Sequence, residues 1–463
     1  MDPDSHDEIA EEEEFLHLLN AMLGKQHGCY EAADYEDDLV ACAGIILHGA
    51  EEARKIRAER RQERRLYLIR PDLLPNPRAD TPWQILYLGR NNRAFVTTMG
   101  FDVRTFELIL EEGFAHVWES TPIPRSDVPS SSAPRIYRRS LDAPGALGLV
   151  LHFLNSTMVD TNLCEIFAVI PTTVSQYIAF SIKILLATLR KMEDAQIRWP
   201  QGDTFQENNT LIVARHPLLI GAFGSLDGLN LVVQTSKDQE IENATFNGWL
   251  HEHFVSSVLA FSPFGMSISP ALIWATFTMR PIIVGDVMAC NLNAPGSWHD
   301  SRVAKPIYKK LRSRTPEGYY LVADTAFPRG SDQILGRIRA PVKEGTQLPA
   351  NCATRKEMEK FDRQLLSYRQ TAEWGNRTIQ GTFGRLRVPL PINYGDLRGD
   401  LLECCIWLCN LRTRTVGYNQ TRTVYKDVWS NEESLWLTFE HMLFADQRRN
   451  DRVGRFYMIF GDD

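Results

Sequence analysis

The chain has 463 residues, of which 44% are hydrophobic and 24% are charged, and its formal net charge is −7. This ordinary globular composition excludes a collagen-like, low-complexity or wholly disordered chain. Polar residues interrupt the apolar stretches well before about 18 positions, so we expect no membrane-spanning helix and no membrane partner. Because the chain is acidic overall, binding to nucleic acid would require local basic patches.

The first residues, MDPDSHDEIAEEEE, contain eight acids and no base. This is the opposite of the basic n-region of a secretory signal, and it predicts an intracellular protein. The chain also has eight cysteines but no CxxC pair. Such spacing favours reduced thiols over disulfides or a structural zinc site.

Residues 1–65 are predicted to form an acidic and then basic N-terminal segment. Its basic part, EEARKIRAERRQERR at 51–65, carries seven bases and four acids. Two interpretations stay open: a solvated helix with ion pairs four residues apart, or a nuclear-import segment that contacts the DNA backbone through Arg60, Arg61 and Arg64. Residues 66–142 form a further N-terminal region, which ends in the proline-rich loop PIPRSDVPSSSAPR.

Residues 143–200 are predicted to form a helix-turn-helix-like helical domain. Pro144 suits the first turn of one helix, Asp160 can cap a second, and Pro171 can start a third. A short helix, a tight turn and a longer helix are typical of the helix-turn-helix motif. Four polar side chains at the start of the third helix could reach DNA phosphates or base edges: Thr172, Thr173, Ser175 and Gln176. A plain three-helix bundle is the alternative.

From 210 to 425 the pattern indicates strands and helices in one α/β domain. Apolar strands are predicted at about 219–226 and in HFVSSVLAFSPFG, IIVGDVMACNL and GYYLVADTAFP. Helices are predicted from Asp300 onwards and over 354–387. This order predicts a mixed sheet flanked by helices, followed by a C-terminal tail over 426–463.

Two aspartates follow apolar strands in this region, Asp227 after GSL and Asp324 after LVA. A carboxylate at the end of a buried strand is partly desolvated, and two such groups side by side repel unless a cation neutralises them. A third acid from a nearby helix would complete an oxygen site suited to Mg²⁺ or Mn²⁺. The alternative is that each aspartate is only a turn residue.

Five stretches in order resemble the PIF/Harbinger transposase superfamily, in its fungal branch with a DDE superfamily endonuclease domain: SLDGLN, NGWLHEHF, NAPGSWHDSRV, VADTAFP and AEWGNRTIQGTFGRLR. Upstream, TPWQILYLGRNNRAFVTTMGFD, PRIYRRSLDAPGALGLVLHFLNST and IPTTVSQYI resemble the region before that domain. The resemblance covers roughly 65–425. It implies an RNase H-like DDE endonuclease domain over 210–425, preceded by a helix-turn-helix.

The resemblance also implies a catalytic site. Asp227 matches the first acid of the family, Asp324 the second and Glu373 the third. These carboxylates are therefore expected to hold two divalent cations, Mg²⁺ or Mn²⁺, of which one would polarise the attacking water or 3′-OH and the other stabilise the departing oxyanion. The implied activity is cleavage of phosphodiester bonds at transposon ends and joining of the 3′-OH to target DNA. Gly375 is expected to let DNA or backbone approach Glu373 closely.

Two features depart from the family pattern. In better-known members the third acid lies just before Phe-Gly-Arg-Leu, where this chain has Gln380, seven residues beyond Glu373 on the same helix face. Asp300 and Gln380 are candidate supporting residues, and Asp300 is alternatively only a helix N-cap. Residues 266–280 interrupt two strands that the family joins by a short turn, either as an extra loop or through a gene-model error.

The resemblance implies DNA as the substrate and the nucleus as the location. In the family a separate Myb-like protein commonly supplies DNA binding, so a Myb-like accessory protein and a homo-oligomer are candidate partners. A second class of function stays open: a catalytically decayed or domesticated transposase descendant that binds DNA without cutting it. The acids at 227, 324 and 373 favour the enzyme, whereas Gln380 and the 266–280 segment favour decay.

Overall fold

The computed structural model describes residues 44, 48–56, 59, 68–124, 133–263, 285–328, 334, 336–342 and 351–416. Contacts divide the chain into two units, Met1–Leu68 and Ile69–Asp463. In the first unit residues 48–56 are helical, and Lys55 pairs with Glu52 at 3.0 Å. Some sequence predictions fall outside the described residues: Arg60, Arg61, Arg64, the 266–280 segment and the 426–463 tail.

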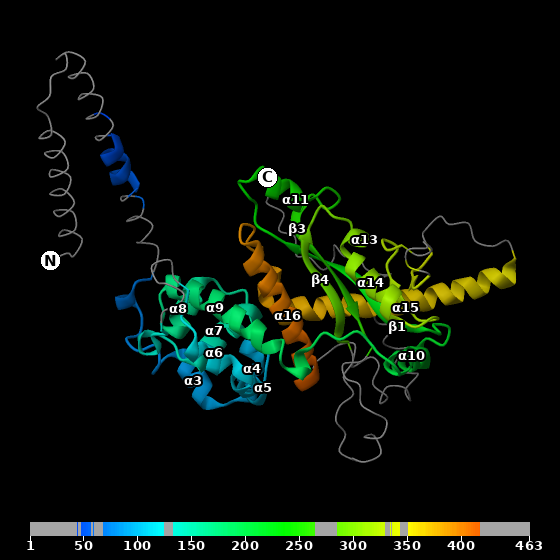
Figure 1. Cartoon of the computed structure of the whole chain (residues 1–463), viewed down its shortest axis with the longest axis horizontal. Coiled ribbons are helices and arrows are strands. Elements are labelled where there is room, and N and C mark those ends of the chain that lie inside the picture. The colour runs from blue at the N-terminus through cyan, green and yellow to red at the C-terminus, as the bar shows by residue number, and fades with distance from the viewer. Residues whose placement is uncertain are drawn as a thin grey trace, which may run out of the picture. The chain divides into compact units, whose positions relative to one another are not determined.

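The second unit begins with a body of helices (Figure 1). Its helices are α3 (Pro82–Gly89), α4 (Asn92–Met99), α5 (Val103–Ile109), α6 (Ala115–Ser120), α7 (Ala143–Asn155), α8 (Asp160–Phe167) and α9 (Pro171–Leu189), with short turns η1 (Arg70–Asp72), η2 (Leu110–Phe114), η3 (Ile136–Arg138) and η4 (Glu193–Ala195). Trp83 of α3 is buried against Gly148 of α7, where a Cβ would come within 2.3 Å of the indole ring. Helices on both sides of residue 142 therefore share one core.

The helices α7, α8 and α9 follow the predicted order. Pro144 lies in the first turn of α7, and Pro171 is the first residue of α9. Asp160 was expected as an N-cap, but it is the first residue of α8, and Val159 occupies the cap position. A carboxylate in the first turn still favours the helix electrostatically. By length and apolar composition α9 could cross a membrane, yet 61% of its most apolar stretch is buried inside the protein, as in a core helix.

The rest of the unit contains a mixed sheet. Its strands are β1 (Ala222–Val232), β2 (Phe246–Asn247), β3 (Glu252–Phe261), β4 (Val287–Pro295), β5 (Tyr320–Ala323) and β6 (Ile338–Arg339). The strands run in the order β2-β3-β1-β5-β6, with β4 also paired to β3. The pairs of β1, β2 and β4 with β3 are antiparallel, whereas β1–β5 and β5–β6 are parallel. This arrangement is the mixed sheet that the sequence predicts.

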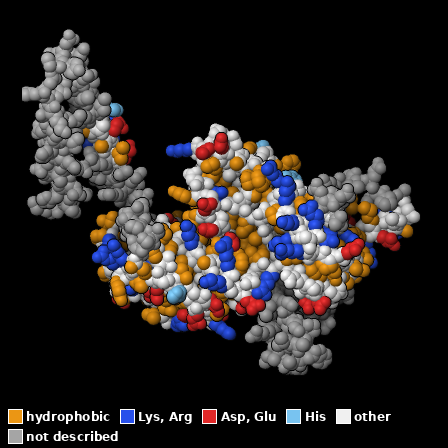
Figure 2. Space-filling view, in the orientation of Figure 1, with side chains coloured by type: hydrophobic (Ala, Val, Ile, Leu, Met, Phe, Trp, Pro, Cys, Tyr) orange, Lys and Arg blue, Asp and Glu red, His pale blue; other side chains and the backbone are white. Residues whose placement is uncertain are grey.

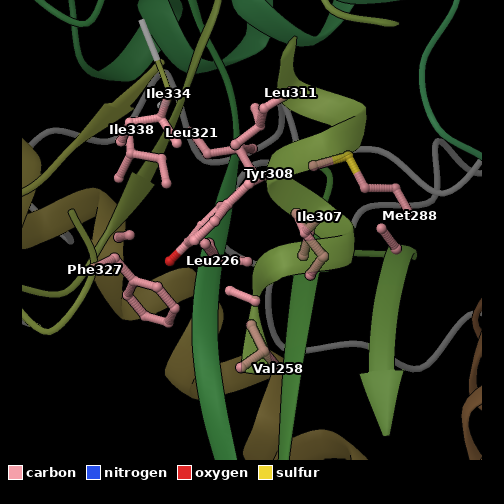
Figure 3. Packing of buried hydrophobic residues seen from close by; sticks show 14 of the residues in the cluster. Leu226, Val258, Met288, Ile307, Tyr308, Leu311, Leu321, Phe327, Ile334 and Ile338 are labelled. Atoms are coloured by element: carbon pink, nitrogen blue, oxygen red, sulfur yellow. The ribbon is translucent and has the colours of Figure 1, made fainter. Parts of the chain in front are cut away.

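Helices cover both faces of this sheet: α10 (Thr204–Arg215), α11 (Gln239–Thr245), α13 (Asp300–Val303), α14 (Lys305–Arg314), α15 (Cys352–Thr382) and α16 (Gly395–Thr415), with the turn η5 (Gly384–Arg387). Figure 3 shows how α14 packs Ile307, Tyr308 and Leu311 against Leu226 and Leu321 of the sheet. These apolar residues occupy one side of α14, which leaves its basic residues on the other.

The helix α16 joins the sheet to the helical body. The side chain of Asn410 forms two hydrogen bonds with the backbone of Val287, both 2.9 Å long, and so extends the start of β4. On the helical body, Arg190 at the end of α9 forms a two-pronged ion pair with Glu403 of α16, at 3.1 and 2.7 Å. The sheet and the helices before it are therefore held by one shared element.

The helix α15 lies unusually close to the sheet. A Cβ at Gly375 would come within 2.5 Å of the Phe261 ring of β3, and the Thr371 hydroxyl donates to the Ser225 hydroxyl of β1 at 3.0 Å. Gly375 was expected to let DNA or backbone approach closely; it is buried, and the group that approaches it is an aromatic ring of the protein's own core. The glycine thus fixes how near the residues of α15 come to β1.

Gly375→Ala should destabilise the protein by roughly 1–3 kcal/mol, because the new methyl group overpacks against the Phe261 ring. The matched control is Gly381→Ala on the same helix, where the nearest atom to a Cβ is Arg387 Nη2 at 3.8 Å. Alanine there should stabilise by up to about 1 kcal/mol through helix propensity. Thermal unfolding of both variants measures the difference, and equal shifts would contradict the close packing.

Candidate active site

The parallel pairing of β1 and β5 brings Asp227 and Asp324 to neighbouring positions. Leu226 is paired with Ala323, and the two aspartates are the next residues on each strand. Asp324 follows the end of β5, as predicted, but Asp227 was expected at a strand end and instead lies inside β1, which continues to Val232. The pairing with β5 stops at Leu226, which leaves Asp227 half-buried at the edge of that pairing.

Asp227 points toward α15. Its Oδ2 accepts a hydrogen bond from Nδ2 of Asn376 at 3.1 Å, and Ser225, two residues earlier, also contacts α15. Leu226 between them belongs to the core beneath α14. This alternation follows from the two-residue period of a strand, and it places the first acid on the face of the sheet that carries Glu373.

Arg369 connects the other two acids. Its Nη2 lies 2.9 Å from Oε1 of Glu373, one turn further along α15, and its Nη1 lies 3.5 Å from Oδ1 of Asp324. The same guanidinium stabilises the charged form of Asp227. Two carboxylates therefore contact one cation, and Asp227 lies close enough to feel its charge. The three acids and Arg369 together formally carry −2 when all three acids are ionised.

Burial dominates the electrostatics of Asp227 and raises its pKa to about 6. The hydrogen bond from the Gly228 N–H and the charge of Arg369 oppose this rise, whereas the charges of Glu373 and Asp324 add to it. These couplings mean that Asp227, Asp324 and Glu373 form one electrostatic group.

Asp300 approaches from the opposite face of the sheet. His299, not Asp300, caps α13, because the His299 ring accepts from the Ser301 N–H at 3.3 Å. The Asp300 carboxylate lies over Gly228 of β1, where a Cβ would be only 2.5 Å from Oδ2. Burial raises the Asp300 pKa, and the nearby charge of Asp324 raises it further. Asp300 thus neighbours the acid cluster without sharing its face.

Asn376 and Arg369 were not identified as site residues from the sequence. Asn376 is 8% exposed, and its Nδ2 donates to the Gly228 carbonyl at 3.0 Å as well as to Asp227. Its Oδ1 has no hydrogen-bond partner among the described residues. The available signal was spacing, since positions 369 and 376 lie one turn on either side of Glu373, toward the same side of the helix.

The other predicted residues are placed as follows. Gln380 is half-buried and lies about 10 Å beyond Glu373 along the helix axis, so Asn376 is much nearer to the first acid. At the start of α9 three of the four predicted DNA-contacting side chains are exposed: Thr172, Ser175 and Gln176. The fourth, Thr173, is half-buried. Their contact with DNA stays a prediction.

The oxygen atoms of the candidate residues are of the type that hard divalent cations prefer, but they are not grouped closely enough to surround one ion. Within the described residues no three His, Cys, Asp or Glu side chains are grouped so that they could hold a metal ion. The Arg369 guanidinium bridges Asp324 and Glu373 and supplies the positive charge there. The candidate donors are carboxylate oxygens and the unpartnered Oδ1 of Asn376, which are ligand types that Mg²⁺ and Mn²⁺ prefer. Binding would require Arg369 to turn away.

Residues 283–410 match a family model described as DDE superfamily endonuclease. The matched segment runs from just before β4 into α16 and contains Asp300, Asp324 and Glu373, whereas Asp227 precedes it. This match supports a relationship to the DDE transposase superfamily and a nuclease-type domain. No curated protein and no solved structure gives a significant match to the chain.

Asp227→Asn should stabilise the metal-free protein, by an amount that grows between about pH 4 and pH 7. The folded pKa of about 6 lies above the ordinary 3.8. Below about pH 4 the carboxyl is neutral in both the folded and the unfolded protein, so its burial carries no ionisation cost. As pH rises, the unfolded protein ionises first, and the folded protein loses stability relative to it until the pH passes about 6. The expected gain at pH 7 is on the order of 2–3 kcal/mol. Asparagine retains an acceptor for Asn376.

Thermal unfolding in EDTA from pH 4.5 to 7.5 measures this difference. Glu357→Gln, at an exposed position of α15, controls for the removal of one negative charge. A stability difference between Asp227→Asn and wild type that stays constant with pH would contradict the raised pKa.

Proposed function

We propose that this protein is a metal-dependent DNA endonuclease of the DDE transposase type, with an RNase H-like core. The observation that carries the proposal is the placement of Asp227 and Asp324 just beyond the last paired residues of β1 and β5, together with Arg369, which pairs with both Asp324 and Glu373. Two of these acids lie in the segment that matches the endonuclease family. The order of antiparallel and parallel strands is consistent with the RNase H-like core that the resemblance implies.

In this proposal the three carboxylates are the catalytic residues and hold divalent cations, Mg²⁺ or Mn²⁺. Such cations, when bound, activate an attacking oxygen and stabilise the leaving oxygen of a phosphodiester. Asn376 holds Asp227 through its amide N–H and presents a second oxygen beside it. Asp300 limits the movement of β1 by filling the space above Gly228. Arg369 holds Asp324 and Glu373 in place through its two ion pairs.

We further propose the PIF/Harbinger reaction, in which transposon ends are cut and the 3′-OH is joined to target DNA. The support is the resemblance of the five sequence stretches around the acids. Nuclear location, a Myb-like accessory protein and a homo-oligomer belong to the same proposal and rest on the same resemblance.

The second candidate is a transposase descendant that binds DNA without cutting it. The observation that favours it is the guanidinium of Arg369 at the centre of the acids, together with the lack of a closed metal site in the described residues. The two candidate functions predict different metal binding as well as different activity, so measurements of metal binding and of cleavage can distinguish them.

Glu373→Gln should abolish Mg²⁺- or Mn²⁺-dependent nicking of supercoiled plasmid while the circular dichroism spectrum stays unchanged. The reason is that a third carboxylate is needed to offset the charge of two divalent cations. Gln380→Ala is the matched control on the same helix and should reduce nicking only modestly. Asn376→Ala should reduce it by roughly 10–100-fold, as for a residue that orients a ligand.

Calorimetric titration with Mn²⁺ separates the two candidates without relying on activity. Wild-type protein should bind Mn²⁺ and Glu373→Gln should bind it much more weakly. A wild-type protein that binds DNA but neither binds Mn²⁺ nor nicks plasmid would favour the non-cutting descendant, and nicking by Glu373→Gln at the wild-type rate would remove Glu373 from the site.

A further inference from the structure

A strongly basic surface lies on α13 and α14. Between Ser301 and Pro316 the chain has six bases and no acid. Five of the six bases are exposed: Arg302, Lys305, Lys309, Arg312 and Arg314. Figure 2 shows Lys and Arg side chains gathered over this part of the molecule. We call these five residues the α13–α14 surface.

The charges of this surface are poorly neutralised by the protein. Lys305, Lys309 and Arg314 form no ion pair within the part of the chain that the structure describes. Arg302 instead places its guanidinium 3.8 Å from the Trp298 ring centroid. Elsewhere, the exposed base Arg355 is paired along its own helix with Glu359 at 2.8 Å. These three residues therefore keep positive charge that no ion pair in the described part of the chain offsets.

Helix stability does not explain this distribution. Lys305 is the first residue of α14, and the first turn contains no acid. The N-terminal end of a helix carries partial positive charge, so a lysine there is unfavourable and an acid would be favoured. Burial lowers the pKa of Lys310, and the nearby charge of Arg314 lowers it further. A bound anion would relieve repulsion of this kind.

The surface starts beside the candidate active site. Asp300, the first residue of α13, lies against Gly228, and Gly228 is the neighbour of Asp227 in β1. By contrast, the predicted helix-turn-helix has little attraction for a polyanion. From Asp160 to Ile182, across α8 and most of α9, the chain has two acids and no base.

We propose that the α13–α14 surface binds the phosphodiester backbone of duplex DNA and guides it to the acid cluster. This inference rests on the proposed endonuclease function, and it names the surface that receives the substrate. The exposed bases form ion pairs with successive phosphates. Arg302, whose guanidinium lies over the Trp298 ring, is the preorganised contact nearest to the acids in sequence, two residues after Asp300.

The decisive experiment compares two double charge reversals that are matched in spacing and charge. Lys305→Glu/Lys309→Glu changes two exposed lysines four positions apart in α14, and Lys356→Glu/Lys360→Glu changes two exposed lysines four positions apart in α15. Binding to a fluorescent DNA duplex is measured by anisotropy in EDTA at several salt concentrations, with the full-length protein. EDTA prevents cleavage, so binding is measured independently of catalysis.

The α14 reversal should lower affinity at least about tenfold and reduce the salt slope of log K by roughly 2, since each lost phosphate contact removes about 0.9. The α15 reversal should change affinity less than about threefold. Lys305→Gln/Lys309→Gln should reduce the salt slope similarly, which distinguishes lost contacts from new repulsion. Circular dichroism should show all variants folded.

Equal effects of the two reversals, or an unchanged salt slope in the glutamine variant, would overturn the inference. Tighter binding of an RNA duplex than of DNA by the wild-type protein would overturn it as well. The proposed function can fail separately: a protein that binds DNA through α14 but needs neither Asp227 nor Glu373 for any cleavage would retain the surface and lose the active site.

Discussion

The candidate site depends on the close approach of α15 to β1 and β3. Gly375 lets the Phe261 ring pack directly on the helix backbone, and the Thr371–Ser225 hydrogen bond fixes the helix along β1. Because the helix backbone lies this near, a side chain as short as Asn376 can reach both Asp227 and the Gly228 carbonyl. A residue with a side chain at position 375 would move the helix outward and separate the third carboxylate from the other two.

The charge balance of the acid cluster is set by Arg369. With Arg369 in place, one positive charge faces three carboxylates, and burial holds the pKa of Asp227 near 6. Divalent cations would bring more positive charge, but each needs the oxygen positions that the guanidinium now contacts. Arg369 is half-buried, and the proposed metal site would require its side chain to turn away from Asp324 and Glu373.

The sequence predicts the presence of the strands better than where they end, and it does not predict which residues contact the candidate acids. Asp324 is correctly placed because its strand is short and apolar, whereas β1 runs past Asp227 because its later residues pair with β3 and not with β5. Helices α3 to α6 lie within the N-terminal region 66–142, for which no individual helix was predicted, and Pro82 begins α3. Arg369 and Asn376 carry no pattern of their own, since their roles arise from contacts across the sheet. Glu373 needed the family resemblance to be chosen among many acids.

The candidate acids and the α13–α14 surface belong to opposite sides of the sheet. At Gly228 the start of α13 packs against β1, the strand that carries Asp227. Asp227 faces α15, whereas α13 and α14, which carry the basic surface, pack on the opposite face of the sheet. Gly228 leaves space for the Asp300 carboxylate, so the start of α13 lies directly against β1. A larger residue at 228 would displace α13 and, with it, the bases that follow. The close packing on both faces of β1, at Gly228 and at Gly375, therefore sets the distance between the bases proposed to hold a phosphate backbone and the carboxylates proposed to act on it.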